Sequence, residues 1–444
     1  MKIGYIGLGA LGSQLARRFL PDHSLCVWDI NPGAANAFAA LGADVAPTAA
    51  ELARRCDVIF LCLPRSSDVR NVVFGESGLA AGLSAGKLVV DQTSGIPEET
   101  WRIADELLQS GVEMMDAAVS ASPHIVMSGG ATLMASASDP VFERALPALR
   151  AITATIYRCG SRVGDGQAMK TVNNAMNAGC RLGTLEVVAA GRKAGLSLAS
   201  MSDFLSRSEA RNQTTEKMLP ALLEGKQSTN FTLSLLLKDV TQAVSLGVSN
   251  RVPMPLTTIV RSLLQIGVNT LGDNAQLEDM VGLIESMAGT RMADNSDAPS
   301  PTEANAKSIE HVGQHDIADL ITSAIASLCR LVTYECIAAG LRYGLRLEDM
   351  AEVISRGSGW SDASKSVFAE LLGGTGGAGR DLMSVTDSVE AACALGDRRG
   401  APMLIANTVR CLLEQAVNQL GAARLEDLAG LYDAMTGARL KRSA

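Results

Sequence analysis

Residues 2–12 read Lys-Ile-Gly-Tyr-Ile-Gly-Leu-Gly-Ala-Leu-Gly, a short apolar run that passes into three regularly spaced glycines. A helical pattern of apolar residues follows and continues to Leu20. Glycines spaced as GxGxxG between a strand and a helix permit a tight turn and a close backbone approach to a pyrophosphate at the helix N-terminus. The stretch therefore predicts that the fold begins with a dinucleotide-binding unit. Its expected contact residues are Gly7, Leu8, Gly9, Ala10, Leu11 and Gly12.

A second apolar run covers residues 25–28 and ends at Asp29. A carboxylate at this distance from the glycines can accept hydrogen bonds from both hydroxyls of the adenosine ribose, and it repels a 2′-phosphate. No arginine that could bind such a phosphate occurs in residues 30–33. The sequence therefore favours NAD over NADP, with Asp29 as the ribose ligand. The alternative is a glycine turn followed by an ordinary surface aspartate.

More apolar runs of strand length follow, separated by helical patterns. They cover residues 58–63, 87–90, 113–116, 132–135 and 155–159. This alternation indicates an open, doubly wound sheet that binds its ligand at the carboxyl ends of the strands. Leu63-Pro64 and Thr93-Ser94 lie at two such ends. These residues either line the dinucleotide or simply terminate their strands.

From Gly164 onward the apolar period becomes that of long helices. Residues 172–194 are rich in Ala and Gly, and the segment is long enough for a helix buried between layers. Lys170 lies at its start, with Asn173 and Asn174 at i+3 and i+4, so all three can share one side of the first turn. The helix dipole disfavours a cation at that end, which supports a chemical role for Lys170. The alternative is an exposed lysine beside two capping amides.

The helical segment occurs twice, at a constant offset of 149 residues that aligns Glu186 with Glu335. Further matching pairs are Pro253-Met254 with Pro402-Met403, and Leu271-Gly272 with Leu420-Gly421. The offset becomes 148 where residues 277–279 match residues 425–427, which indicates a single deletion in a loop. Opposite Lys170, Asn173 and Asn174 the second copy has Asp319, Thr322 and Ser323. Only the first copy thus keeps polar residues suited to catalysis.

The expected fold class is α/β plus all-α, with an N-terminal Rossmann-type doubly wound sheet followed by two related helical domains. The expected boundaries are 1–160 for the NAD-binding domain, 161–293 for the helical substrate and catalytic domain, 294–306 for a linker, and 307–444 for the degenerate second copy. The linker is assigned from its Asp, Asn, Ser, Pro and Glu content, which is typical of an exposed connection.

The composition narrows the range of partners. Hydrophobic residues make up 47% of the 444, and the formal net charge of −8 argues against nucleic acid or an acidic membrane as a general partner. The nine cysteines include no CxxC pair, which indicates reduced thiols in a cytoplasmic protein. No apolar run appears long enough to predict a membrane span. His311 and His315 could share a helical face but lack a third ligand, so no metal is expected.

Five motifs follow one another along the first two thirds of the chain. They are Gly7 to Gly12, Asp91 to Pro97, Asp116 to Ser120, Gly164 to Asn174, and Phe231 to Asp239. Together they resemble the β-hydroxyacid dehydrogenases, a family that includes 3-hydroxyisobutyrate dehydrogenase and tartronate semialdehyde reductase. The resemblance implies an N-terminal dinucleotide-binding domain, an all-helical second domain and a cleft site between them.

The resemblance also implies roles for individual residues. Lys170 matches the catalytic lysine, Asn174 the substrate-binding amide beside Asn173, Ser120 the substrate-binding serine, and Lys238 the lysine near the nicotinamide end of the cofactor. An ammonium within hydrogen-bond reach can stabilise the charge that develops on the substrate oxygen during hydride transfer, or relay its proton. We therefore expect Lys170 to be the general acid in reduction and to assist deprotonation in oxidation.

The predicted substrate loop departs from the Asp-Ala-Pro-Val-Ser-Gly-Gly pattern of the relatives. This chain has Ala118 for the proline and Ala121-Ser122 for the two glycines. With Ser120, these two residues form the expected substrate loop, yet their side chains restrict the backbone freedom with which glycines cradle a carboxylate. His124 is inserted after them and is either a substrate contact or a solvated loop histidine.

The leading hypothesis is an NAD-dependent oxidoreductase that transfers a hydride between the nicotinamide and a small 3-hydroxy acid or its semialdehyde or keto acid. An imine reductase of the same architecture is a second reading, although the resemblance implies that such enzymes usually lack the lysine that Lys170 matches. A non-catalytic dinucleotide-binding protein is the third, favoured by the altered loop and the degenerate copy. We expect the second copy to dock on the first as an intrachain pseudo-dimer, and whole chains could in addition pair as a homodimer.

Overall fold

The computed structural model describes residues 1–293, 316–374 and 379–440. The chain divides into two compact units, Met1–Lys170 and Thr171–Ala444, and each is described by itself. The predicted linker at 294–306, together with His311 and His315, lies outside the described residues. The boundary predicted at residue 160 and the subdivision of the helical part stay predictions.

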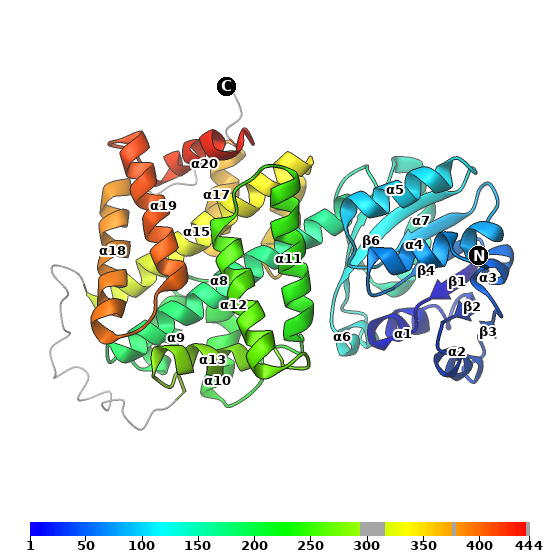
Figure 1. The fold of residues 1–444 in the computed structure, drawn as a ribbon, viewed down its shortest axis with the longest axis horizontal. Helices are drawn as coiled ribbons and strands as arrows, with labels where there is room; N and C mark the ends of the chain where they lie inside the picture. Colours follow the sequence, from blue (N-terminus) through cyan, green and yellow to red (C-terminus); the bar gives the residue numbers. More distant parts are fainter. Residues whose placement is uncertain (294–315, 375–378, 441–444) are drawn as a thin grey trace. The chain divides into compact units, whose positions relative to one another are not determined.

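Unit 1 is built on one eight-stranded sheet with the order β3-β2-β1-β4-β5-β6-β7-β8 (Figure 1). Its strands are β1 Lys2–Ile6, β2 Ser24–Trp28, β3 Asp44–Val45, β4 Val58–Leu61, β5 Leu88–Asp91, β6 Glu113–Ser120, β7 Thr132–Ser136 and β8 Thr155–Arg158. Strands β1 to β6 pair in parallel, as expected for a doubly wound sheet, and β7 also runs parallel to β8. The predicted α/β class is confirmed.

Three features of the sheet differ from the sequence prediction. Strand β7 runs antiparallel to β6, because only the short segment between Ser120 and Thr132 joins them and leaves no room for a crossover. Strand β6 continues to Ser120, four residues past its predicted end at Asp116. The short strand β3 was not predicted, because two residues carry no readable periodicity.

Helices cover both faces of this sheet. They are α1 Ala10–Arg17, α2 Pro32–Ala39, α3 Ala49–Arg55, α4 Ser66–Phe74, α5 Pro97–Leu108, α6 Pro123–Met127 and α7 Asp139–Ile152. Successive strand residues face opposite cores: Tyr5 packs with α1, α2, α6 and α7, while Ile6 packs with α3, α4 and α5. The period of two along β1 thus buries both faces of the strand, as parallel sheets require.

The described part of unit 2 is built of helices, starting from α8, which spans Asp165–Lys193 and so begins in unit 1. The helices of the first copy are α9 Leu198–Ser206, α10 Leu219–Leu223, α11 Leu233–Ser249, α12 Pro255–Leu271 and α13 Asp279–Ala288. Those of the second copy are α15 Ile317–Tyr343, α16 Leu347–Arg356, α17 Asp362–Leu371, α18 Leu382–Arg399, α19 Leu404–Leu420 and α20 Leu428–Thr436. The second copy repeats the helix order of the first.

The long helices α8 and α15 pack at the centre of unit 2 (Figure 1). A Cβ on Gly183 would lie 2.0 Å from Leu328, and a Cβ on Gly179 would lie 2.8 Å from Val332. In the 149-residue register Gly179 is equivalent to Leu328, and Gly183 is equivalent to Val332. Each glycine of α8 therefore contacts the residue of α15 that is equivalent to the other glycine. This cross-pairing is the contact pattern of a two-fold axis between the copies.

A buried glutamate of each copy caps the N-terminus of a helix in the other copy, in the same two-fold arrangement. Glu186 accepts hydrogen bonds from the backbone N–H groups of Ile405 (2.9 Å) and Ala406 (2.9 Å) at the start of α19. Glu335 accepts those of Leu256 (3.1 Å) and Thr257 (2.7 Å) at the start of α12. The first N–H groups of a helix have no partner within the helix, so each glutamate satisfies donors that would otherwise be buried and unpaired. Each copy therefore completes a helix of the other.

These exchanged caps predict a pH-dependent stability. Burial raises the pKa of both Glu186 and Glu335 to about 7, although the backbone hydrogen bonds oppose that rise. The folded state therefore binds these protons more tightly than the unfolded chain, and the extra stability is complete below about pH 4.5 and lost as the pH rises through about 7. Within this window each glutamate contributes up to about 1.4 kcal/mol per pH unit.

The measurement is thermal unfolding from about pH 4.5 to about pH 8 for the wild type and for Glu186→Gln and Glu335→Gln. The wild-type unfolding temperature should fall as the pH rises, and the glutamine variants should fall less steeply. Parallel curves for wild type and variants would contradict the assignment, because they would attribute the slope to other groups.

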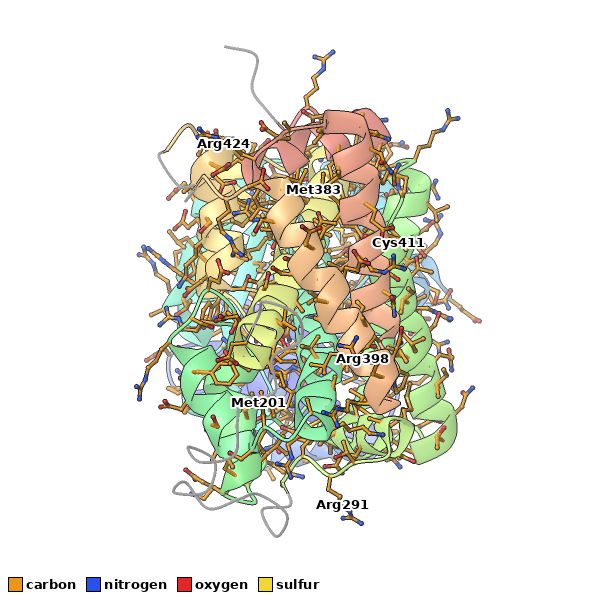
Figure 2. The ribbon with its side chains drawn as sticks, turned by 90° about the vertical axis from the view of Figure 1, so that its left-hand side faces the viewer. Met201, Arg291, Met383, Arg398, Cys411 and Arg424 are labelled. Atoms are coloured by element: carbon orange, nitrogen blue, oxygen red, sulfur yellow. The ribbon has the colours of Figure 1, made fainter. Side chains whose placement is uncertain are left out.

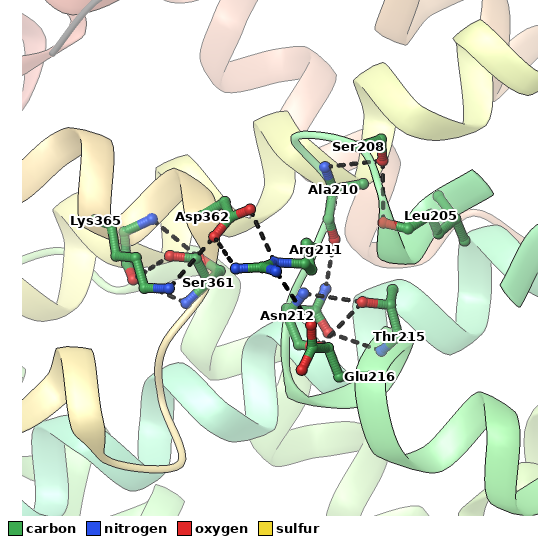
Figure 3. A network of polar contacts seen from close by, with 11 residues as sticks. Leu205, Ser208, Ala210, Arg211, Asn212, Thr215, Glu216, Ser361, Asp362 and Lys365 are labelled. Atoms are coloured by element: carbon green, nitrogen blue, oxygen red, sulfur yellow. Dashed lines mark hydrogen bonds and ion pairs between the residues drawn. The ribbon is translucent and has the colours of Figure 1, made fainter. Parts of the chain in front are cut away.

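Loops of the two copies also meet where α9 and α16 end (Figure 3). Asn212 and Ser361, which are equivalent in the 149-residue register, form an antiparallel bridge. The guanidinium of Arg211 donates to both carboxylate oxygens of Asp362 at 3.0 and 3.3 Å, and the Asp362 N–H donates to the Arg211 carbonyl at 2.9 Å. The predicted contact between the copies is therefore polar here and apolar along α8 and α15.

Helices α18 and α19 form one face of unit 2. They lie side by side on it, with Met383, Arg398 and Cys411 exposed (Figure 2). Among the described helices, α15 alone is long and apolar enough to cross a membrane. However, 89% of its most apolar 18-residue segment is buried inside the protein. All nine cysteines lie among the described residues, and none of them forms a disulfide.

Candidate functional site

The glycine loop between β1 and α1 has the backbone that its spacing predicts. Gly7 has φ +94°, and a Cβ there would lie 2.2 Å from the Cys62 carbonyl oxygen. A Cβ on Gly12 would lie 2.0 Å from the Gly7 carbonyl oxygen. A Cβ on Gly9 would meet nothing within 4 Å, and no side chain caps the α1 N-terminus that Gly9 begins. Two glycines serve the turn, and the third leaves open space at a helix N-terminus.

Asp29 follows β2 and lies against this loop. Its carboxylate accepts the Leu8 N–H at 2.6 Å and the Asn31 N–H at 2.7 Å. These bonds fix the carboxylate beside the glycine turn, 21 residues along the chain from Leu8. The geometry agrees with the spacing argument, because a carboxylate held here stands at the end of β2 where an adenosine ribose lies in this fold.

The residues predicted at the ends of β4 and β5 are joined by a hydrogen bond. The Leu63 N–H donates to Thr93 Oγ1 at 3.1 Å, and the Thr93 N–H donates to Asp91 Oδ1 at 2.9 Å. Pro64 follows Leu63 directly and begins the connection to α4. The two strand ends therefore form one continuous carboxyl edge with β1 and its glycine loop.

Two buried carboxylates on that edge anchor the start of α8. Asp91 and Asp116 occupy matching positions on the parallel strands β5 and β6. Asp116 accepts the N–H groups of Gly164 (2.7 Å) and Gln167 (2.8 Å), as well as the hydroxyl of Ser136. Burial raises the pKa of Asp91 to about 6 and that of Asp116 to about 7, against the opposing effect of these hydrogen bonds. Asp116 thus acts as the N-terminal cap of α8.

Gln167 and Lys170 extend this anchor by one helical turn. The Gln167 amide donates to Asp91 Oδ2 at 3.0 Å and to the Thr93 carbonyl at 3.0 Å, and it accepts the Thr100 hydroxyl at 2.8 Å. Lys170 Nζ donates to Ser94 Oγ. A fully tied glutamine therefore fixes the rotation of the helix, and the lysine amine lies at the carboxyl end of β5.

The predicted substrate loop, Ser120 to Ser122, connects β6 to the short helix α6 and contains no glycine. Ser120 is the last residue of β6, and Ser122 precedes the short helix α6, which packs against α1. His124 is exposed, and its Nδ1 lies 3.1 Å from Ser122 Oγ. Ala121 is half-buried against the apolar core of unit 1. Ala121 thus packs against the core, and Ser122 leads into the helical turn of α6. The two residues do not form a glycine cradle.

The remaining predicted residues lie in unit 2, where they form a polar chain. The Asn173 amide donates to Asn174 Oδ1 at 3.1 Å, and the Asn174 amide donates to Asp239 Oδ2 at 2.7 Å. Lys238 Nζ lies 3.8 Å from Asp239 Oδ1. Asp239 thus holds the Asn174 amide and lies beside the predicted cofactor lysine.

The structure gives roles to Asp91, Asp116, Ser136 and Gln167 that the sequence did not predict. A signal for the first two was present, because each is a carboxylate at the expected end of an apolar strand. Their partners could not be inferred, since Gln167 and Gly164 come from another element.

Two families of known proteins match this chain. The NAD binding domain of 6-phosphogluconate dehydrogenase matches residues 2–160. The family described as NAD-binding of NADP-dependent 3-hydroxyisobutyrate dehydrogenase matches twice, at residues 164–284 and 313–433. The internal repeat found in the sequence is therefore a duplication of this second domain.

Individual relatives point to the same family as the domain matches. The chain is 31% identical over 299 residues to 2-(hydroxymethyl)glutarate dehydrogenase of Eubacterium barkeri, covering 66% of this chain and 98% of that protein. It is 28% identical to mitochondrial 3-hydroxyisobutyrate dehydrogenase of Mus musculus, covering 60% of this chain and 81% of the relative. Mycobacterium tuberculosis 3-hydroxyisobutyrate dehydrogenase shares the fold, with a TM-score of 0.60, 22% identity, and coverage of 64% of this chain and 98% of the other. The chain belongs to the 3-hydroxyisobutyrate dehydrogenase family of β-hydroxyacid dehydrogenases, with the helical domain of that family present twice.

Proposed function

We propose that this protein is an NAD-dependent dehydrogenase of a small 3-hydroxy acid, with Lys170 as its general acid and base. The observation that carries the proposal is the hydrogen bond of Lys170 to Ser94 at the carboxyl end of β5, on a helix anchored by Asp91 and Asp116. Ligands of doubly wound sheets bind at this edge. A lysine held there by buried neighbours is preorganised to act on a bound substrate.

The glycine loop and Asp29 fit a nicotinamide dinucleotide. Gly9 leaves open space at the N-terminus of α1 for a pyrophosphate, and Asp29 supplies a carboxylate for the ribose hydroxyls. We assign the other cofactor contacts to Leu63, Pro64, Thr93 and Lys238. When bound, the nicotinamide supplies the hydride acceptor in oxidation and the hydride donor in reduction.

The protein side chains handle the proton and hold the substrate. In oxidation the Lys170 side chain accepts the proton of the substrate hydroxyl, and in reduction it returns that proton. Ser120, the Ala121-Ser122 backbone, Asn173 and Asn174 supply donors for a carboxylate and a hydroxyl. The named relatives act on hydroxymethylglutarate and hydroxyisobutyrate, which carry both groups. We therefore infer a small hydroxy acid as substrate.

The cofactor choice gives a testable prediction. Asp29→Asn should raise the ratio of kcat/KM with NADP to kcat/KM with NAD by at least about tenfold, because it removes the charge that repels the 2′-phosphate. Steady-state kinetics with both cofactors measures the ratio. Asp44→Asn is the control, since Asp44 is an exposed carboxylate on the neighbouring strand β3. A preference that Asp29→Asn leaves unchanged would contradict the role of Asp29.

We further propose that the second copy takes the place of a partner subunit, which makes the helical unit an intrachain pseudo-dimer. The reciprocal caps of Glu186 and Glu335 and the bridge at Asn212 and Ser361 support this proposal. Its partners are then a small-molecule substrate and the cofactor rather than nucleic acid or a membrane, and whole chains could in addition pair as a homodimer. The free cysteines and acidic charge suit a cytoplasmic enzyme.

A substrate panel tests the function. Purified protein is assayed spectrophotometrically for NAD and NADP reduction with a series of 3-hydroxy acids, and for cofactor oxidation with the corresponding semialdehydes and with cyclic imines. Turnover of one or more hydroxy acids with NAD is the expected result. Turnover of imines alone would favour imine reduction. Cofactor binding without any turnover would favour a non-catalytic protein.

A further inference from the structure

The second helical copy reaches the polar chain that holds Asn174. The hydroxyl of Ser358 accepts the Asn173 amide N–H at 3.0 Å, and the Gly359 N–H donates to Asn173 Oδ1 at 3.0 Å. Both residues belong to the loop between α16 and α17, about 185 residues along the chain from Asn173. One asparagine of the first copy is therefore held at both ends of its amide by the second copy.

Two glycines allow this close approach. A Cβ on Gly357 would lie 2.5 Å from Asn173 Oδ1, and a Cβ on Gly359 would lie 2.7 Å from the Asn173 carbonyl oxygen. Neither glycine has a positive φ, so the contact rather than the backbone conformation requires them to be small. The loop Gly357-Ser358-Gly359, called here the clamp loop, fits around Asn173 without space for a side chain at either glycine.

The equivalent loop of the first copy lacks these features. In the 149-residue register Gly357, Ser358 and Gly359 correspond to Ser208, Glu209 and Ala210, and Asn173 corresponds to Thr322. Glu209 forms an ion pair with Arg380 instead. Asn174 and Asp239 correspond to Ser323 and Ser388, and the hydroxyl of Ser323 is buried without a hydrogen-bond partner among the described residues. The clamp therefore exists only on the side of the pseudo-dimer that keeps the catalytic polar residues.

We propose that the clamp loop is a positioning element for substrate binding, in which the second copy orients Asn173 and, through it, Asn174. The chain of contacts runs from Ser358 and Gly359 to Asn173, from Asn173 to Asn174, and from Asn174 to Asp239. With Asn173 Oδ1 accepting the Gly359 N–H, the Asn173 amide nitrogen must point toward Ser358 and Asn174. This proposal rests on the proposed function, because Asn174 is its assigned substrate ligand.

This role explains why the duplicated domain is retained without catalytic residues of its own. A substrate ligand on α8 is useful only when its amide orientation is fixed, since an asparagine flipped by 180° exchanges donor and acceptor. Asp239 fixes one end of the network and the clamp loop fixes the other. The second copy thus orients the substrate ligands, and the side chains that take part in the reaction belong to the first copy.

The test is steady-state kinetics of full-length Ser358→Ala, Ser358→Thr and Gly359→Ala with the hydroxy acid that the wild type oxidises. Ser358→Ala removes one hydrogen bond and should raise KM for the acid about three- to tenfold while kcat changes less than about twofold, because the interaction is made in both the ground and transition states. Gly359→Ala should raise KM more, since its Cβ displaces Asn173. Ser358→Thr keeps the hydroxyl and should restore KM toward the wild-type value.

Two controls separate positioning from a general loss of structure. Glu209→Ala changes the equivalent loop of the first copy and should leave KM unchanged. The dissociation constant for NAD, measured by fluorescence, should change little in the variants, because all the proposed dinucleotide contacts except Lys238 lie in unit 1. These results together would support the proposal.

The contrary outcomes are distinct. If Ser358→Ala and Gly359→Ala both keep a wild-type KM, or if Glu209→Ala raises KM equally, the clamp loop has no specific role and the proposed function stands. If kcat falls while KM stays constant, positioning of a ground-state ligand is wrong. If the wild type oxidises no hydroxy acid in the panel, the proposed function fails and the role of the clamp loop fails with it.

Discussion

Lys170→Ala is expected to lower kcat/KM for the hydroxy acid by about 10²- to 10⁴-fold, the usual contribution of a positioned general acid or base. The amine lies at the carboxyl end of β5, hydrogen-bonded to Ser94, on the turn of α8 that Asp116 and Gln167 hold in place. Removing it leaves the substrate oxygen without a proton acceptor in oxidation and without a donor in reduction. The cofactor and substrate contacts elsewhere are retained, so the loss should appear mainly in kcat.

Steady-state kinetics with NAD measures the effect, and the NAD dissociation constant checks that the glycine loop is intact. Lys226→Ala is the control, because Lys226 is an exposed lysine that pairs with Glu224 near the end of α10. Lys170→Arg adds a second test: it keeps the positive charge but cannot release its proton at neutral pH, so it should rescue little activity. Near-wild-type turnover by Lys170→Ala would remove the catalytic assignment.

Glu370→Ala is expected to destabilise the protein by about 3–5 kcal/mol, the usual cost of leaving one partner of a buried ion pair unpaired. The Glu370 carboxylate accepts two hydrogen bonds from the Arg330 guanidinium, at 2.8 and 2.9 Å. The two side chains are only 8% and 9% exposed, so solvent cannot replace the lost carboxylate. Arg330 also donates to the Tyr334 hydroxyl at 3.2 Å, which leaves the arginine tied in place with its charge unmatched.

Chemical denaturation measures this loss. Glu414→Ala is the matched control, because Glu414 pairs with Arg410 at i,i+4 on α19 and both side chains are at least 30% exposed. That variant should cost about 0.3–0.5 kcal/mol. If Glu370→Ala cost no more than Glu414→Ala, the buried pair would have no structural role.

The first copy contains an equivalent buried arginine that lacks the carboxylate partner. Arg181 corresponds to Arg330, and Ala221 stands where the second copy has Glu370. The Nε and Nη1 groups of Arg181 are buried without a hydrogen-bond partner among the described residues. Burial lowers the pKa of this arginine to about 10. The second copy therefore pairs its buried arginine with a carboxylate, whereas the first copy leaves two donor groups of the equivalent arginine without a partner among the described residues.

The local features of the site were predictable from the sequence. The positions of the glycine loop, Asp29 and the strand ends at Leu63 and Thr93 follow from residue type and short spacing, and hydrogen bonds join them at one edge of the sheet. Their roles as cofactor contacts stay predictions. The loop after Ser120 was harder to predict. Its two replaced glycines predicted an altered turn, but the helix α6 depends on packing against α1, which lies about one hundred residues earlier.

The sequence by itself determined the parallel strands β1, β2 and β4 to β6, the dinucleotide loop, the duplication and the loss of Lys170 from the second copy, because glycine spacing, apolar period and internal repeats are properties of the chain that need no partner. The pairing of β3 with β2 and the antiparallel direction of β7 came from packing. Only the tertiary structure decided which carboxylate caps which helix and which loop holds Asn173. Asp116 reaches Gly164 across 48 residues, and Glu186 reaches Ala406 across 220. A buried carboxylate or amide accepts whatever donor the packing brings within about 3 Å, and a one-dimensional pattern does not specify that donor.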